Sequence, residues 1–337
     1  MMPIPVACQG LGPIGLQIAR RLITRPGISV VAGLDLDAAK AGRDLGELAG
    51  GARLGLAVTT EVPRCPDGRA GVLVNATGSR LGATAPDLIS ALDKGWNVLS
   101  TCEELAYPGV TGAALAAELD TKARAAGASI LGAGINPGFL LDALVLVLTT
   151  VCVTVRRVEV ARTVDTNQRR LPLQAKAGVG LTAGDFRARA AAGTLGHVGL
   201  RESASLVCAG LGWPVDDYTE TIDPVLAPEA VSTGLGVIPE GSAIGQLQTA
   251  TVRSGGEVVL RYRLQMSAGA PPRDSIDIFG EPDVHQQISA GVNGDIGTVA
   301  VLANLVPVLA AARPGLLTMA DVVGAHCAQA LPGGPVS

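Results

Sequence analysis

Three glycines near the start of the sequence, Gly10, Gly12 and Gly15, have a spacing that could hold a phosphate group. They lie between a short apolar run and a stretch with apolar residues at helical spacing. In such a turn the first glycine permits the tight bend, the second lets the backbone approach a pyrophosphate, and the third lets helix and strand pack closely. The next apolar run ends in Asp35, about 20 residues further on, where an acid binds a ribose 2′-hydroxyl. The arrangement predicts a dinucleotide site; a chance tight turn is the less favoured interpretation.

Two adjacent acids, Glu103 and Glu104, follow the apolar run 97–100. In an open α/β sheet, ligands bind at the carboxyl ends of the strands, so we expect these carboxylates near the reactive end of the dinucleotide. A partly desolvated carboxylate there has a raised pKa and can act as a general base. A capping or solvent-exposed loop carboxylate is the alternative.

Other side chains offer rival chemistry. Cys102 could be a thiolate nucleophile, but a neighbouring pair of carboxylates raises the pKa of a thiol, so a packed cysteine is favoured. His197 could be an acid, a base or an orienting group, and a structural histidine is the alternative. Four polar residues after a strand could line a substrate pocket or form a solvated loop: Arg162, Asp165, Asn167 and Arg169.

The elements that position these residues change in character along the chain. Over residues 1–135, near-continuous apolar runs alternate with helical patterns, which predicts an α/β fold with a doubly wound parallel sheet. Thr84 is expected to cap one of the helices, with Pro86 in its first turn. Residues 136–296 are predicted to form an α+β domain with a mostly antiparallel sheet, because polar and apolar residues alternate around the hairpin signal Gly255-Gly256. A C-terminal helix, 297–325, is expected to rejoin the first domain.

Composition excludes several classes of protein. The 337 residues carry a net charge of −4 without a basic stripe, so no nucleic-acid partner is expected. Six cysteines without a C-x-x-C pair, and only three histidines, suggest neither a disulfide framework nor a metal site, and fit a reducing cytoplasm. The most apolar run, 140–155, is shorter than the roughly 20 residues that a membrane span needs, so no membrane partner is expected.

Six ordered motifs between residues 5 and 323 resemble the 2,4-diaminopentanoate dehydrogenase family, which includes the native amine dehydrogenases. The motifs are the glycine turn, Ser100–Leu105 with Pro108, Gly134–Phe139, Arg170–Lys176, Gly196–Leu200 and Asn293–Thr298. The resemblance implies a Rossmann-type N-terminal domain like that of dihydrodipicolinate reductase and a homodimer built through the second domain. It also implies NAD(P)-dependent oxidative deamination of an amine to a ketone or aldehyde plus ammonia, and the reverse reductive amination.

The resemblance also assigns roles to residues. The family's catalytic acid lies in a T-C-E-E segment, where two glutamates stand here. Homoserine dehydrogenases, which look like more distant relatives, have a catalytic lysine after the same strand, and aligning the two segments places Glu103 at that lysine. Glu103 is therefore the predicted catalytic residue, with Glu104 in the pocket or behind it. Gly297 departs from the alanine usual in the relatives, a small change.

The complete predicted site has two parts and no metal ligand. The predicted cofactor-binding residues are Gly10, Leu11, Gly12, Pro13, Ile14, Gly15, Asp35, Ala76, Thr77, Thr101, Cys102 and Asn136. The predicted substrate-binding residues are Glu104, Phe139, Arg162 and His197. Asp35 favours NAD because it repels a 2′-phosphate, although Lys40 and Arg43 could reach one, so that NADP is a second candidate.

Three functions remain open from the sequence. The first is the amine dehydrogenase, acting on small aliphatic or hydroxylated amines. The second is a reductase or dehydrogenase that acts on a carbonyl or a cyclic imine. The third is a non-catalytic NAD(P) sensor, which would bind the cofactor without turnover.

Overall fold

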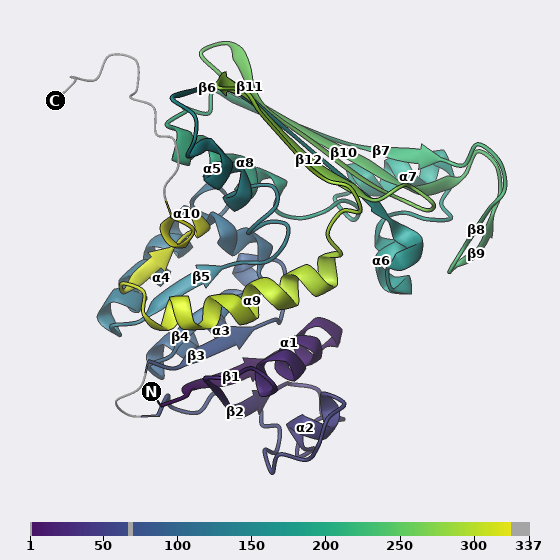
Figure 1. Ribbon diagram of the computed structural model, residues 1–337. Coiled ribbons are helices and arrows are strands. Elements are labelled where there is room, and N and C mark those ends of the chain that lie inside the picture. Colours follow the sequence, from purple (N-terminus) through teal and green to yellow (C-terminus); the bar gives the residue numbers. More distant parts are fainter. Residues whose placement is uncertain (1, 67–69, 325–337) are drawn as a thin grey trace. The chain divides into compact units, whose positions relative to one another are not determined.

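The computed structural model describes residues 2–66 and 70–324. These residues form two compact units, one made of the chain up to Ala143 together with Gly294–Gly324, the other of Leu144–Asn293 (Figure 1). The chain passes from the first unit to the second after Ala143 and returns to the first at Gly294. The predicted domain boundaries were 135/136 and 296/297. Each unit has its own six-stranded sheet.

The sheet of the first unit is parallel throughout, in the order β14-β5-β4-β3-β1-β2. Its strands are β1 (Ile4–Gln9), β2 (Ile28–Leu34), β3 (Val72–Asn75), β4 (Asn97–Ser100), β5 (Ser129–Gly132) and β14 (Gly315–Leu317). Every residue of β3, β4 and β5 is buried, which explains why these strands appear in the sequence as unbroken runs. The predicted α/β fold class is confirmed.

The helices of this unit are α1 (Pro13–Ile23), α2 (Leu45–Leu48), α3 (Leu81–Asp93), α4 (Ala113–Ala125), α9 (Gly294–Ala310) and α10 (Met319–Val322). Helix α1 buries Gly15, Ile18, Ala19 and Leu22, the stripe that its 3.6-residue period predicts. Two short 3₁₀ segments, η1 (Glu103–Ala106) and η2 (Pro108–Val110), follow β4. The first of them, η1, begins at Glu103, the predicted catalytic residue.

Two predicted boundaries in this unit are wrong. Helix α3 begins at Leu81, so that Thr84 is a buried residue inside the helix, where its hydroxyl donates to the carbonyl oxygens of Arg80 and Leu81. The segment 297–325 is not one helix. Its helix ends at Ala310, after which β14 pairs with β5 and α10 follows; residue 325 lies outside the described residues. Pro314 follows the end of the helix by a few residues, and Gly315 is the first residue of the added strand.

The second unit has a mixed sheet in the order β13-β12-β6-β11-β10-β7. Its strands are β6 (Thr154–Asp165), β7 (Asp217–Leu226), β10 (Ala243–Ser254), β11 (Glu257–Ser267), β12 (Arg273–Glu281) and β13 (Val284–Ile288). The predicted hairpin is present, because β10 and β11 pair antiparallel across Gly255-Gly256. The one parallel pair, β6 with β11, lies at the centre of an otherwise antiparallel sheet.

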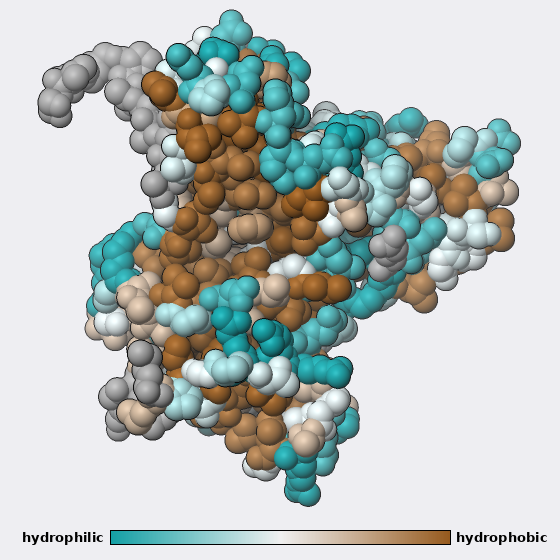
Figure 2. All heavy atoms as spheres, in the orientation of Figure 1, coloured by the Kyte–Doolittle hydropathy of each residue, from teal (hydrophilic) through white to brown (hydrophobic). Residues whose placement is uncertain are grey.

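The remaining elements of this unit are four helices, the 3₁₀ segment η3 (Thr166–Gln168) and a small separate hairpin. The helices are α5 (Ala143–Thr149), α6 (Leu171–Lys176), α7 (Ala183–Ala191) and α8 (Leu200–Leu211), and the hairpin joins β8 (Val231–Thr233) to β9 (Gly236–Ile238). Helix α7 contacts β7, and α8 contacts β10 and β11. Hydrophobic atoms reach the surface at the β8–β9 hairpin (Figure 2), where Leu235 and Val237 are exposed.

Candidate active site

The glycine turn joins β1 to α1 in a conformation that these three residues specify. Gly10 has φ +81°, and a Cβ there would lie 2.7 Å from the backbone carbonyl group of Ala76. A Cβ at Gly15 would lie 1.8 Å from the carbonyl oxygen of Gly10, so no side chain fits between α1 and β1. A Cβ at Gly12, in contrast, would meet no atom within 4 Å. Packing therefore requires Gly10 and Gly15, whereas Gly12 leaves room for a ligand.

The start of α1 suits an anion. Gly12 is the N-cap and provides no side-chain hydrogen bond to the first turn, and Pro13 follows at the first helical position. The backbone N–H groups of a first turn have no acceptor within their own helix, and the helix dipole favours negative charge there. A pyrophosphate fits this combination of open space and N–H donors.

Asp35 follows β2 and is bound to the glycine turn. Its Oδ2 accepts hydrogen bonds from the Leu11 N–H at 2.7 Å and from Lys40 Nζ at 2.9 Å, and its Oδ1 accepts from the Asp37 N–H at 2.8 Å. Burial by itself raises the pKa of this carboxyl group, but the bonds from Lys40, Asp37 and Leu11 outweigh it and lower the pKa. Asp35 is therefore an anion beside the turn, with a cation next to it.

A chain of hydrogen bonds connects the carboxyl ends of β1, β3 and β4. The buried Asn75 donates to Oε1 of Gln9 at 3.2 Å and to Oγ1 of Thr77 at 3.1 Å. Its Oδ1 accepts from Ser100 Oγ at 3.0 Å, and Ser100 Oγ in turn accepts from the Cys102 N–H at 3.1 Å. These bonds fix the backbone at Ala76-Thr77 and Thr101-Cys102, the predicted cofactor contacts beyond β3 and β4.

The two adjacent glutamates differ in what they contact. Glu104 accepts the backbone N–H of Leu81 at 2.7 Å through Oε2 and pairs with Arg80 Nη1 at 2.7 Å through Oε1. Its carboxylate thus caps α3, and both of its oxygens are engaged. Glu103 is the first residue of η1 and is partly buried. Glu104 thus has a structural role at α3, and Glu103 stands just after the carboxyl end of β4.

The sulfur of Cys102 lies in the hydrophobic core of the first unit. Burial raises the pKa of this thiol, the negative charge of Glu103 raises it further, and the hydrogen bond from Thr84 Oγ1 at 3.4 Å only partly opposes these effects. The side chain is a packed thiol, as expected. Any contact of Cys102 with a cofactor would come from its backbone.

The segment after β5 is held by a buried carboxylate that the sequence did not single out. Asp142 accepts the N–H of Gly138 at 2.8 Å and that of Ala143 at 2.6 Å. Gly138 has φ +117°, and a Cβ there would lie 2.3 Å from Gly134 N, so the chain folds back tightly at this point. Asn136 and Phe139, the predicted cofactor and substrate contacts, are partly buried within this bend.

In the second unit, the guanidinium of Arg162 is buried in an ion pair. Its Nη1 lies 3.1 Å from both carboxylate oxygens of Asp274, and its Nη2 donates to the carbonyl oxygen of Val292 at 2.6 Å. Asp274 Oδ2 also accepts the Val292 N–H at 2.7 Å. The pair therefore holds both peptide groups of Val292. Arg162 is engaged with its own chain, and Asp274 is a partner that sequence inspection missed.

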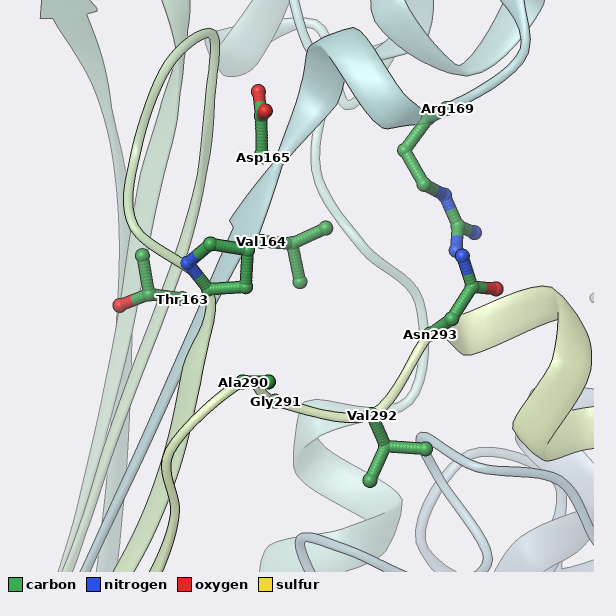
Figure 3. Close-up of a pocket in the computed structure, with 9 residues that line it drawn as sticks. Thr163, Val164, Asp165, Arg169, Ala290, Gly291, Val292 and Asn293 are labelled. Atoms are coloured by element: carbon green, nitrogen blue, oxygen red, sulfur yellow. The ribbon is translucent and has the colours of Figure 1, made fainter.

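Beside this ion pair is a cavity of about 110 Å³. Its lining consists of Thr163, Val164, Asp165, Arg169, Pro272, Ala290, Gly291, Val292 and Asn293. The side chains of Arg169 and Asn293 extend toward each other on one side, while Val164 and Val292 provide apolar surface (Figure 3). Two of the four polar residues grouped in the sequence, Asp165 and Arg169, thus meet at one cavity with Asn293. The backbone of Asn167 is bound to Asp165 Oδ1 instead.

His197 lies in a short loop between α7 and α8, flanked by two glycines with positive φ, Gly196 at +106° and Gly199 at +107°. Its backbone is bound by Gln248 of β10. Glu103, Glu104 and Phe139 belong to the first unit, and Arg162 and His197 to the second.

Among the described residues, no cluster of three or more histidine, cysteine or acidic side chains could hold a metal ion. In the same part of the chain, no helix combines the length and apolar character needed to cross a membrane.

A parallel sheet with a glycine turn, an acid after β2 and a second, mixed-sheet unit defines the fold of the Rossmann-type dehydrogenases. A solved structure of an amine dehydrogenase from Mycobacterium smegmatis superimposes with a TM-score of 0.81, at 23% identity, over 95% of this chain and 96% of that one. GenD2 from gentamicin A biosynthesis, solved in complex with NAD, gives a TM-score of 0.53 at 16% identity over 96% and 91% of the chains.

Sequence comparison is more specific than this likeness of fold. The 2,4-diaminopentanoate dehydrogenase of Acetoanaerobium sticklandii is 27% identical over 96% of this chain and 94% of its own length. The sequence pattern of the 2,4-diaminopentanoate dehydrogenase C-terminal domain matches residues 139–331. The chain belongs to the 2,4-diaminopentanoate dehydrogenase family. This membership confirms the predicted family and, with it, the predicted class of enzyme, an NAD(P)-dependent oxidoreductase that acts on amines.

Proposed function

We propose that this protein catalyses the NAD(P)-dependent oxidative deamination of a small amine to a ketone or aldehyde plus ammonia, and the reverse reaction, with Glu103 as the proton shuttle. The observation that supports the assignment of Glu103 is its place: it is partly buried and starts η1 just after β4, at the carboxyl end of a parallel sheet. Glu104 caps α3 and pairs with Arg80, which is a structural role. In a sheet of this kind, the carboxyl end is where a ligand reacts.

The residues present fit a dinucleotide. The open space at Gly12 and the N–H groups at the start of α1 suit a pyrophosphate, and Asp35 suits the adenosine ribose. Backbone groups at Ala76-Thr77 and Thr101-Cys102, held by the Asn75–Ser100 hydrogen bonds, and the side chain of Asn136 would hold the nicotinamide end. When bound, this cofactor supplies the hydride acceptor for oxidation and the hydride donor for reduction.

The chemistry of Glu103 follows from the charges that deamination creates. Loss of a hydride from the amine-bearing carbon leaves a cationic iminium, which a nearby carboxylate stabilises. Water then attacks that carbon while Glu103 accepts a proton from the water. The resulting acid gives its proton to the departing nitrogen, ammonia leaves, and the carboxylate takes the remaining hydroxyl proton as the carbonyl forms. One carboxyl group can perform all of these transfers, because its anion is the base and its acid form is the acid.

The substrate is proposed to be a short amine. The relative from Acetoanaerobium sticklandii is named for 2,4-diaminopentanoate, a small diamino acid. Aliphatic or hydroxylated amines, with or without a carboxylate, are the compounds to test.

The test is a spectrophotometric assay with a panel of short amines at alkaline pH and either NAD⁺ or NADP⁺. We expect absorbance of the reduced cofactor to appear with at least one amine, and reduction of the matching carbonyl to require added ammonia. Carbonyl reduction without ammonia would instead support the reductase that acts on a carbonyl or cyclic imine. Tight cofactor binding without turnover of any compound would support the sensor.

The assembly is proposed to be a cytoplasmic homodimer formed through the second unit. Leu171, Leu235 and Val237 are exposed apolar residues of that unit, and burial against a second copy would remove them from water. The five cysteines of the described part are free and buried, which suits a reducing compartment. Light scattering after size exclusion should give twice the chain mass of 33.9 kDa. A monomer at micromolar concentration would overturn this assignment.

A further inference from the structure

Three polar side chains form a row at the carboxyl edge of the sheet in the first unit. Gln9, Asn75 and Ser100 are the last residues of β1, β3 and β4, and each is the register partner of the next. Asn75 and Ser100 are fully buried, and Gln9 is only 9% exposed. A buried polar group is costly unless a hydrogen bond satisfies it, so each group of the row needs a partner.

The direction of the hydrogen bonds in this row follows from one backbone group. The N–H of Cys102 can only donate, and it donates to Ser100 Oγ at 3.1 Å. The hydroxyl of Ser100 donates in turn to Asn75 Oδ1 at 3.0 Å, its one acceptor among the described residues. The amide nitrogen of Asn75 must therefore face Gln9, where it donates to Oε1 at 3.2 Å. Gln9 consequently turns its oxygen toward the row and its nitrogen away from it.

The amide nitrogen of Gln9 is a donor that its own chain does not use. In the part of the chain that the structure describes, neither hydrogen on Nε2 meets an acceptor, whereas both polar atoms of the Asn75 carboxamide are bound. Leaving a buried donor unsatisfied costs about 1–3 kcal/mol. The remaining exposure of Gln9 shows that this side chain still reaches the surface. Its donor is therefore accessible to a bound molecule.

This donor lies at the crevice where a dinucleotide crosses such a sheet. β1 has β2 on one side and β3 on the other, so the order of the strands reverses at β1 and β3. In open α/β sheets a ligand binds outside the carboxyl ends of the strands at this switch point. Gln9 ends β1 there and directly precedes the glycine turn, in which Gly10 approaches Ala76-Thr77 beyond β3.

We propose that Gln9 is a further cofactor-binding residue, whose Nε2 donates to an oxygen of the pyrophosphate bridge of the dinucleotide. Asn75 and Ser100 are positioning residues, because their hydrogen bonds hold the carboxamide of Gln9 with its nitrogen toward the ligand. The proposal rests on the part of the proposed function that concerns the cofactor and makes no use of the amine. A hydrogen bond to a charged oxygen is stronger than one between neutral groups, so a single neutral amide can contribute measurably to affinity.

Binding measurements with Q9M and Q9E test this contact. Q9M keeps the length of the side chain without a donor, so the Kd of NADH, measured by fluorescence titration, should rise about tenfold or more. In Q9E one carboxylate oxygen still accepts from Asn75 while the other faces the phosphates as an anion. We therefore expect a melting temperature near that of the parent and a Kd higher than that of Q9M. A Kd within twofold of the parent in either variant would overturn the proposal.

The part of the cofactor that Gln9 contacts is tested with ADP, which carries both phosphates without the nicotinamide half. ADP displaces NADH in competition, and its Kd should rise in Q9M by the same factor as that of NADH. Loss of NADH affinity with unchanged ADP affinity would place Gln9 at the nicotinamide half and overturn the assignment to the pyrophosphate.

Asn97 provides the matched control, a buried amide at the opposite edge of the same sheet. Its Nδ2 donates to the carbonyl oxygen of Gly71 at 3.0 Å, and its Oδ1 accepts the N–H of Ser129 at 2.8 Å. N97A should lower the melting temperature and leave the Kd of NADH within twofold of the parent. A loss of affinity equal to that of Q9M would show that loosening of the sheet weakens binding, and would overturn the proposal. A parent protein that binds NADH without oxidising any amine contradicts the proposed function and leaves the role of Gln9 intact.

Discussion

At the scale of single residues, the structure shows which side chains of the predicted site make structural contacts. Glu103 and Glu104 are identical in type and adjacent in sequence, yet the structure gives Glu104 an α-helix to cap and an arginine to pair with. Arg162 shows the same distinction, because its guanidinium is bound to Asp274 and to the backbone of Val292. Residue type alone did not distinguish these roles, since the partners lie far away in the sequence.

Asp35 should select the cofactor. Its carboxylate lies beside the glycine turn and repels a 2′-phosphate, whereas Lys40, 2.9 Å away, provides a cation once that carboxylate is removed. We expect a lower KM for NAD⁺ than for NADP⁺ in the parent, and a shift of at least tenfold toward NADP⁺ in the kcat/KM ratio of D35S. A tenfold shift in this ratio corresponds to about 1.4 kcal/mol of differential binding, the size of one charge-assisted contact. Initial rates with both cofactors measure it, and an unchanged ratio would remove Asp35 as the selector.

At the scale of elements, the sequence predicted those features that depend on neighbouring residues. The turn into α1, the buried strands β3 to β5 and the hairpin of β10 with β11 all have local signals. The start of α3 was mispredicted because its cap is the side chain of Glu104, 23 residues later, and not Thr84. The strand β14 is too short to show a period, and only its pairing with β5 makes it a strand. Contacts between distant residues therefore limited the prediction.

The glycine turn predicts opposite effects for one substitution at two positions. In G15A, the new Cβ would meet the carbonyl oxygen of Gly10 at 1.8 Å and push α1 away from β1, which should cost about 1–3 kcal/mol of stability. In G12A the Cβ meets no protein atom, so stability should change by less than about 0.5 kcal/mol while the Kd of the cofactor rises at least tenfold. Urea unfolding and NADH fluorescence titration measure the two effects. Equal destabilisation by both changes would contradict the structure of this turn.

The ion pair behind the cavity makes a prediction for the second unit. Arg162 and Asp274 are both almost fully buried, so R162M leaves an unpaired carboxylate in the interior and should cost about 3–5 kcal/mol. The double variant R162M/D274L removes both charges and should regain much of that loss. Thermal unfolding followed by circular dichroism compares the three proteins. A double variant less stable than R162M would show that the two residues do not act as a pair.

At the scale of the whole molecule, the two units differ in their electrostatics. Four carboxyl groups of the first unit have lowered pKa values: Asp35, Asp44, Asp120 and Asp321. The pKa values of Asp35 and Asp321 are lowered although burial opposes the shift. The largest cause of the lowered pKa is the hydrogen bond from the Leu54 N–H for Asp44, and the hydrogen bond from Arg124 for Asp120. In the second unit, burial raises the pKa of Asp274, and the charge of Arg162 only partly opposes it.

These shifts predict that acid destabilises the first unit before the second. A carboxyl group with a lowered folded-state pKa binds fewer protons when folded, so its contribution is present above the unfolded pKa and is lost as the pH falls through the folded value, between about pH 5 and pH 1. The raised pKa of Asp274 acts in the opposite sense, because protonating this buried carboxyl in the folded state relieves its desolvation. Hydrogen exchange from pH 5 to pH 2.5, corrected for intrinsic rates, should show protection lost first in β1 to β5. Earlier loss in β6, β11 and β12 would contradict this assignment.

The role of Glu103 is tested most directly by comparing E103Q with E104Q in amine oxidation. E103Q keeps the shape of the side chain but cannot exchange a proton, so kcat should fall roughly 10²–10⁴-fold while the Kd of the cofactor stays within twofold. E104Q should lower the melting temperature by weakening the cap of α3 and the pair with Arg80, with far less effect on kcat. The reverse ranking of kcat would transfer the proton shuttle to Glu104, and two variants with parental kcat would exclude this segment from the mechanism.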